Sequence, residues 1–201
     1  MVERVSYTHL VVGSSPTPRT ARRRFPSLRE HAMEDSTLNP YLIKKGLSDK
    51  QIEQLIEYAA TDEGLKFTSD PKRFKSKESF EEFSKEILEY YVLTNEEDDL
   101  LGIIWFHDLD LYLNKENPSD YGISFAIRLY GEARGKGLAL PFTEEVMADF
   151  ENSEKYISHP HKKIWLSVSP ENEPAVALYR KLGFKDLEIN KEHNKLLMTL
   201  G

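Results

Sequence analysis

The sequence predicts an α/β domain with a mixed sheet whose faces are covered by helices. Short apolar runs with strand character alternate with segments whose apolar residues recur every three or four positions, as on one face of a helix. Polar turns separate two pairs of strands, which indicates hairpins within the sheet. The 201 residues suit one domain, and a composition of 39% hydrophobic and 11% aromatic residues is sufficient for a core.

Composition excludes several classes of protein. The net charge of −7 argues against a general nucleic-acid binder. The chain has no cysteine, which excludes disulfides, thiolate metal sites and a thiol nucleophile. No apolar run reaches the roughly 18 residues that a membrane span needs, and no hydrophobic signal segment opens the chain. We therefore expect a cytoplasmic protein with no membrane partner.

Residues 1–40 differ in character from the rest of the chain. Residues 5–12 could form a short first strand, and a cluster of glycine, serine and proline follows them. Five arginines then fall within residues 19–29 of an otherwise acidic protein. Two interpretations stay open for this stretch: a flexible, solvated loop or tail, or an arm that binds RNA or phosphate. We place the boundary of the main domain at residue 41.

The first half of this domain is predicted to contain two helices and a hairpin. Ser48 and Gln51 have the form of a capping box, and the apolar spacing behind them predicts a helix over 48–60. A second amphipathic helix is predicted over about 77–89. The strands of the hairpin are 90–94 and 100–106, and the second is so apolar that we expect cover on both faces.

The second half continues the alternation of strands and helices. After a polar loop over 107–120 we predict a strand at 121–129, and then a helix that runs from a glycine-rich turn to about Glu151. A strand at 164–168 follows, and then a short helix that Pro174 opens and Gly183 closes. The last predicted element is a hairpin of the strands 185–190 and 195–200.

The glycine-rich turn at 134–139, Arg-Gly-Lys-Gly-Leu-Ala, is the strongest chemical signal. Gly135 and Gly137 allow a positive φ and a close approach of the backbone. The helix that follows supplies backbone N–H donors and a positive dipole end, and Arg134 and Lys136 add two cations. This combination indicates a cradle for phosphate. The alternative is a tight connection between a strand and a helix, because the turn matches neither a Walker A loop nor Gly-x-Gly-x-x-Gly.

A second signal lies about forty residues further along the chain. Asn172 and Tyr179 are seven residues apart, close to two helical turns, so both side chains can face one cleft. The alternatives are that Asn172 caps the helix and that Tyr179 packs on the sheet with its hydroxyl in solvent.

Together the two segments resemble the GNAT superfamily of N-acetyltransferases. Arg134, Gly137 and Ala139 match the glycine motif of that family. The resemblance covers about residues 42–200, so we expect a GNAT-like N-acetyltransferase domain at 41–201, with the mostly antiparallel sheet of the acyl-CoA N-acyltransferase fold. The second motif of the family is matched by Asn172, Ala175, Ala177, Tyr179, Gly183 and Phe184.

The resemblance implies that acetyl-CoA is the co-substrate and that no metal takes part. The pantetheine arm of coenzyme A would pair with the strand edge at Ile127 and Leu129, and Asn172 would help to fix it. Tyr179 matches the general acid of the family, which would assist the departing thiolate. The pyrophosphate would lie on the backbone of Arg134, Gly135, Lys136, Gly137, Leu138 and Ala139.

The general base is not identified by the sequence. His107, Asp108 and Asp120 are candidates by position near strand ends, with solvated loop residues as the alternative. His159 and His161 could be a metal pair, but the sequence offers no third ligand, so no metal is expected.

The function that we infer is the transfer of an acetyl group from acetyl-CoA to a primary amine by direct attack. The acceptor would be a small amine, an amino acid or a protein N-terminus. One alternative is a non-catalytic acyl-CoA-binding regulatory module of the same fold, and another is an RNA-associated protein that uses the arginine-rich stretch. The sequence leaves open whether two copies form a homodimer.

Overall fold

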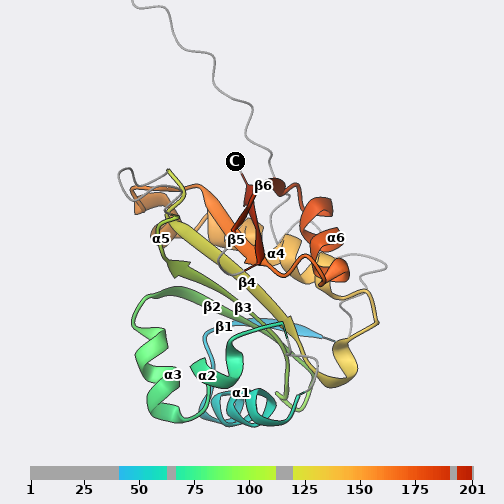
Figure 1. The fold of residues 1–201 in the computed structure, drawn as a ribbon. Helices are drawn as coiled ribbons and strands as arrows, with labels where there is room; N and C mark the ends of the chain where they lie inside the picture. The colour runs from blue at the N-terminus through green and yellow to red at the C-terminus, as the bar shows by residue number, and fades with distance from the viewer. Residues whose placement is uncertain (1–40, 63–66, 112–119, 191–193, 201) are drawn as a thin grey trace, which may run out of the picture.

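The computed structural model describes residues 41–62, 67–111, 120–190 and 194–200. Within these ranges seven strands form one sheet in the order β1-β2-β3-β4-β5-β7-β6 (Figure 1). Of the strand pairs described, β4 with β5 is parallel and the rest are antiparallel, which confirms the predicted mixed, mostly antiparallel sheet. The strands are β1 (Leu42–Lys45), β2 (Ile87–Thr94), β3 (Leu100–Asp108), β4 (Ile123–Leu129), β5 (Ile164–Val168), β6 (Lys185–Asn190) and β7 (Lys195–Leu200).

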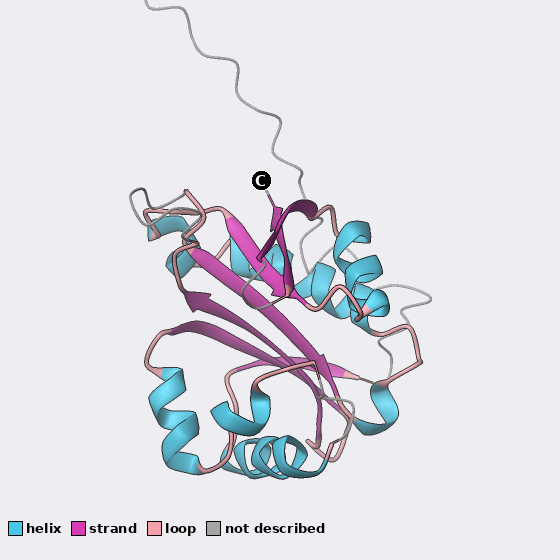
Figure 2. Cartoon of the chain, viewed as in Figure 1, coloured by secondary structure: helices cyan, strands magenta, loops and turns pink. Residues whose placement is uncertain are grey.

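Helices cover both faces of this sheet (Figure 2). One layer contains α1 (Asp49–Thr61), α2 (Asp70–Arg73) and α3 (Lys77–Ser84). The opposite layer contains α4 (Ala139–Glu151), α5 (Glu154–Ser158) and α6 (Glu173–Lys181). A short 3₁₀ helix, η2 (Gly131–Ala133), connects β4 to the glycine-rich turn. None of the helices in the described ranges is long and apolar enough to cross a bilayer.

Strand β3 lies between two hydrophobic cores, one on each face of the sheet. Ile104 and Phe106 belong to the core beneath α4 and α6, whereas Ile103 and Trp105 belong to the core beneath α1, α2 and α3. Side chains of a strand alternate between the two faces of the sheet, so a strand covered on both faces is apolar throughout. The prediction that this strand is covered on both faces is therefore confirmed.

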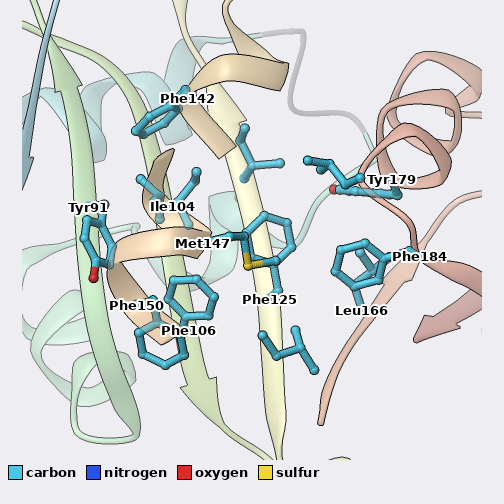
Figure 3. Close-up of a cluster of buried hydrophobic side chains, with 14 of the residues drawn as sticks. Tyr91, Ile104, Phe106, Phe125, Phe142, Met147, Phe150, Leu166, Tyr179 and Phe184 are labelled. Atoms are coloured by element: carbon cyan, nitrogen blue, oxygen red, sulfur yellow. The ribbon is translucent and has the colours of Figure 1, made fainter. Parts of the chain in front are cut away.

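The core beneath α4 and α6 is rich in aromatic side chains (Figure 3). The rings of Phe106 and Phe150 are stacked with their centroids 3.6 Å apart. Phe125 on β4 contacts Phe184, with the ring centroids 5.9 Å apart. The first contact attaches α4 to β3, and the second attaches the residue before β6 to β4, the strand that leads toward the glycine-rich turn.

Two predicted helix ends are confirmed in detail. Ser48 accepts a hydrogen bond from the backbone N–H of Gln51, and the Gln51 side chain accepts one from the backbone N–H of Ser48, which completes the capping box of α1. Gly183 has a φ of +93°, and Phe184 folds back so that its N–H donates to the carbonyl of Tyr179 at 3.0 Å.

Several predicted boundaries were wrong. The helix expected over 77–89 ends at Ser84, because Ile87 already pairs with His107 in the sheet. The strand expected at 121–129 begins at Ile123, since Tyr121 makes only an isolated bridge to Lys162.

Three short elements, β1, α2 and α5, were not predicted, because four or five residues carry too little periodicity to detect. The strand expected at 5–12 and the arginine-rich stretch lie outside the described residues.

Candidate active site

The sheet opens between β4 and β5. These strands pair only at their first residues, where Ile123 lies opposite Ile164 and Ser124 opposite Trp165. From there β5 continues to pair with β7, while β4 runs on to Leu129 along β3 (Figure 1). The second half of β4 therefore has one edge that no described strand covers.

Hydrogen-bond alternation identifies the groups that face this open edge. The N–H of Tyr130 donates to Leu101 of β3 at 2.8 Å, so Tyr130 and every second residue before it direct their backbone groups toward β3. Ile127 and Leu129 lie between these positions and direct their N–H and C=O groups toward the gap. An extended polar chain can add to a strand edge of this kind as an additional strand.

Two arginines already bond to the carbonyls of this edge. Nη1 of Arg128 donates to the carbonyl of Ile127 at 2.8 Å, and Nε of Arg134 donates to the carbonyl of Leu129 at 2.8 Å. A carbonyl oxygen has two lone pairs, so each keeps one position for a further donor.

The glycine-rich turn follows this edge after Tyr130 and η2. Gly135 and Gly137 have φ values of +74° and +75°, and a Cβ atom built at either position would meet no heavy atom within 4 Å. The turn leads into α4, whose N-cap residue, Leu138, is buried and makes no side-chain capping bond. The first N–H groups of a helix without a capping side chain are suited to bind an anion.

The two cations of the turn are engaged with neighbouring side chains. Arg134 forms a bidentate ion pair with Asp62, with N–O distances of 2.7 and 2.5 Å. Nζ of Lys136 lies 3.1 Å from the Tyr41 hydroxyl and 3.5 Å from a carboxylate oxygen of Glu132. The bond to Tyr41 raises the pKa of Lys136. Both cationic side chains remain partly exposed, 39% for Arg134 and 45% for Lys136.

The side chain of Tyr179 extends from α6 toward β4, and its hydroxyl group points to the open edge of that strand (Figure 3). Its ring contacts Phe125 and Phe184 at centroid distances of 6.2 and 5.9 Å, and the residue is only 6% exposed. Burial raises the pKa of its phenol, and the positive charge of Arg128 opposes that rise. Tyr179 is therefore a neutral O–H donor near pH 7.

Asn172 is the N-cap residue of α6, and its side-chain oxygen accepts a hydrogen bond from the N–H of Ala175 at 3.4 Å. The cap that the sequence left as an alternative is therefore present. A contact of Asn172 with a cofactor stays a prediction.

The three candidate bases lie at the opposite end of β4. Asp108 pairs in register with Ile123, about 13 Å along the strand from Ile127 at the usual rise per residue. His107 bonds to Glu86 at 3.0 Å and Asp120 to Lys163 at 3.2 Å. The structure therefore does not bring these residues to the open edge.

His159 and His161, the two histidines considered as a metal pair, lie at the same distant end. Nε2 of His159 lies 3.2 Å from Asp108, and its Nδ1 lies 2.8 Å from the carbonyl of His161. Among the residues that the structure describes, no group of three His, Cys, Asp or Glu side chains could hold a metal ion.

Sequence reasoning missed a buried charged cluster beside the open edge. Arg128 projects from β4 to the face covered by α1, α2 and α3, where it meets the fully buried Asp70. Tyr130 lies in the same core, and its buried hydroxyl has no hydrogen-bond partner among the described residues. One signal was available, because an arginine at a strand position on a covered face needs a buried partner.

Comparison with a protein-family model gives a match over residues 30–185, and the model describes an acetyltransferase (GNAT) domain. No curated protein matches the chain.

Solved structures of similar fold cover most of the chain. Spermidine N-acetyltransferase from Vibrio cholerae, in complex with CoA and spermine, is 16% identical with a TM-score of 0.57, over 80% of this chain and 94% of that chain. Ribosomal-protein-S5-alanine acetyltransferase from Vibrio fischeri is 16% identical with a TM-score of 0.55, over 84% of this chain and 94% of that one. Aminoglycoside N(6′)-acetyltransferase from Legionella pneumophila is 15% identical with a TM-score of 0.53, over 80% and 91%.

Proposed function

Because the chain belongs to the GNAT acetyltransferase family, we propose that it transfers an acetyl group from acetyl-CoA to a primary amine by direct attack. One observation carries this proposal: the open edge of β4 continues through η2 and the glycine-rich turn to an uncapped helix N-terminus, and the hydroxyl of Tyr179 faces this edge (Figure 3). The site thus contains three features: a phosphate cradle at the glycine-rich turn, an open strand edge on β4 that an extended chain can pair with, and a proton donor in Tyr179.

Coenzyme A would lie along these three features. Its pyrophosphate would bond to the backbone N–H groups of 134–139, and its pantetheine arm would pair with Ile127 and Leu129. Arg134 and Lys136 would exchange their present carboxylate partners for phosphate oxygens, which their partial exposure permits. The thioester would then lie where β4 and Tyr179 face each other.

The reaction needs no reactant besides acetyl-CoA, the amine and water as the proton acceptor. The nitrogen of the neutral amine attacks the thioester carbonyl carbon, a C–N bond forms, and the C–S bond breaks. Backbone N–H groups of the open edge would stabilise the oxyanion. Tyr179 donates its proton or a hydrogen bond to the departing thiolate, and the nitrogen loses its proton to water, because the structure brings none of the candidate bases to this place. The products are an N-acetyl amide and CoA.

The acceptor we propose is a small amine, an amino acid or a protein N-terminus. The names of the three similar structures refer to spermidine, to an aminoglycoside and to a ribosomal-protein alanine, and all three enzymes are N- or alanine acetyltransferases by name. The net charge of −7 of the present chain favours a cationic acceptor through long-range attraction.

A screen for thiol release from acetyl-CoA with pooled amines tests this function. The chain has no cysteine, so every thiol detected by a disulfide reagent comes from CoA. We expect release with at least one pool of polyamines, aminoglycosides, amino acids or peptides. The non-catalytic alternative predicts that acetyl-CoA raises the melting temperature while no pool releases thiol.

Two glycines with the same backbone conformation provide a test of the phosphate cradle. Gly137 lies in the glycine-rich turn with a φ of +75°, and Gly46 lies outside the site with a φ of +76° and equally open surroundings. Alanine at either position should cost about 1–2 kcal/mol of stability, because a Cβ disfavours positive φ. Only Gly137→Ala should weaken the binding of CoA, by about tenfold or more, which corresponds to one lost charge-assisted hydrogen bond.

Isothermal titration calorimetry with CoA measures both variants. Equal affinities of Gly137→Ala and Gly46→Ala for CoA would contradict the placement of the pyrophosphate at this turn.

A further inference from the structure

The pair of Asp70 and Arg128 is a buried ion pair next to the open edge of β4. Nε and Nη2 of Arg128 donate to the two carboxylate oxygens of Asp70 at 2.6 and 3.1 Å. Asp70 is fully buried and the Arg128 side chain is 15% exposed. The guanidinium also lies 5.0 Å from the ring centroid of Trp105. Its position is thus fixed by a bidentate bond and by an aromatic surface.

The remaining nitrogen of this guanidinium extends to the edge where the reaction is proposed. Nη1 of Arg128 donates to the carbonyl of Ile127, which faces the gap between β4 and β5. Tyr179 faces the same gap from the other side and contacts Phe125, which is two residues before Ile127 on the same face of β4. The charge of Arg128 and the hydroxyl of Tyr179 are therefore on either side of one strand segment.

The charge of Arg128 acts on the Tyr179 phenol. The positive charge of Arg128 lowers the pKa of Tyr179 against the effect of burial. Burial lowers the pKa of Arg128, but the charge and hydrogen bonds of Asp70 outweigh this effect, so the pKa is raised and Arg128 stays charged although it is buried. Arg73, which donates to Asp70 at 3.4 Å, is a further charged group in contact with this pair.

We propose that Arg128, held by Asp70, is a positioning residue for acetyl transfer: it fixes the Ile127 carbonyl at the open edge and keeps the Tyr179 hydroxyl a competent proton donor. This inference rests on the proposed function, in which Tyr179 assists the departing thiolate. A fixed positive charge across the strand from the phenol favours the form that has given up its proton, and it also attracts the negative charge that develops on sulfur.

A double-mutant cycle on kcat tests this coupling. Arg128→Met should lower kcat by about tenfold in the wild-type background, which is less than the roughly 10²–10⁴-fold of a group that itself transfers the proton, because Arg128 acts through Tyr179. In the Tyr179→Phe background the same substitution should lower kcat by less than about threefold, because the group through which Arg128 acts has been removed. A purely structural role predicts the same factor in both backgrounds.

Three further variants distinguish the effect of losing the Arg128 charge from the effect of destabilising the fold. Arg128→Met leaves Asp70 as a buried unpaired charge, so the cycle is repeated with Asp70→Asn/Arg128→Met in place of the single variant. Arg128→Lys keeps the charge and should recover more than half of the lost kcat. Arg73→Met removes another arginine from the same carboxylate and should leave kcat within about twofold of the wild type.

The outcomes distinguish this inference from the proposed function. Equal losses of kcat in the two backgrounds, or a kcat of Asp70→Asn/Arg128→Met equal to that of the wild type, overturn the role of Arg128 and leave Tyr179 as the acid. An unchanged kcat in Tyr179→Phe alone overturns the acid role itself. A loss in Arg73→Met as large as in Arg128→Met also overturns the inference, since the effect would then belong to the whole cluster.

Discussion

Tyr179→Phe is expected to lower kcat by about 10² or more while the affinity for acetyl-CoA stays nearly unchanged. The substitution removes one oxygen from a ring that stays packed against Phe125 and Phe184, so the aromatic contacts across the gap are kept. The thiolate would then leave without a donor. Steady-state kinetics with the acceptor found by the thiol-release screen gives kcat, and calorimetry gives the affinity.

Tyr90→Phe is the matched control for this measurement. Tyr90 is a partly buried tyrosine in the opposite core, where its hydroxyl lies 2.9 Å from the hydroxyl of Ser84. Burial raises its pKa to about 12, so it is also neutral near pH 7. We expect Tyr90→Phe to keep the kcat of the wild type. Turnover by Tyr179→Phe at the same rate as Tyr90→Phe would remove Tyr179 from the mechanism.

Asp70→Ala is expected to destabilise the protein by about 3–5 kcal/mol, which is the usual cost of removing one partner of a buried ion pair. The substitution leaves the Arg128 guanidinium in the core with its bond to the Ile127 carbonyl but without a counter-charge. Denaturant unfolding, followed by circular dichroism, gives the free energy of unfolding from the midpoint and slope.

Asp186→Ala is the matched control, because Asp186 forms a bidentate pair of the same type with Arg180. The N–O distances are 3.2 and 2.6 Å, but both side chains are about half exposed. Solvent screens such a pair, so its loss should change the free energy of unfolding far less than the loss of Asp70. Similar changes in the two variants would mean that burial does not determine the contribution of the Asp70 pair.

Much of the fold could be predicted from the sequence because its signals are local. The capping box of Ser48 and Gln51, the apolar run of β3 and the Gly183-Phe184 helix end each depend on neighbouring residues, and the structure contains all three. The glycine-rich turn before α4 is predictable for the same reason, since its glycines permit the positive φ values that the turn adopts.

The parts that could not be predicted depend on contacts between distant segments. Ile87 has helical spacing with Phe80 and Phe83, yet pairing with His107 of β3 places it in a strand. Arg128 and Asp70 are 58 residues apart, and no spacing rule connects them. The pairing of Arg134 with Asp62 is likewise a tertiary contact, so the sequence alone indicated a cation at that position but not its carboxylate partner.

The short pairing of β4 with β5 has a consequence for how the protein unfolds. Among the described residues, β4 and β5 share two register pairs, and an isolated bridge joins Tyr121 to Lys162 just before them. Side-chain packing therefore contributes more than the backbone ladder to holding strands β1 to β4 against strands β5, β7 and β6. Such a seam is where a subglobal unit separates first in native-state hydrogen exchange. A cofactor that lies along the seam would supply the missing backbone pairing. We therefore expect that, with acetyl-CoA bound, the two halves of the sheet open together in native-state hydrogen exchange. The ligand that reacts would then also make unfolding of the two halves cooperative.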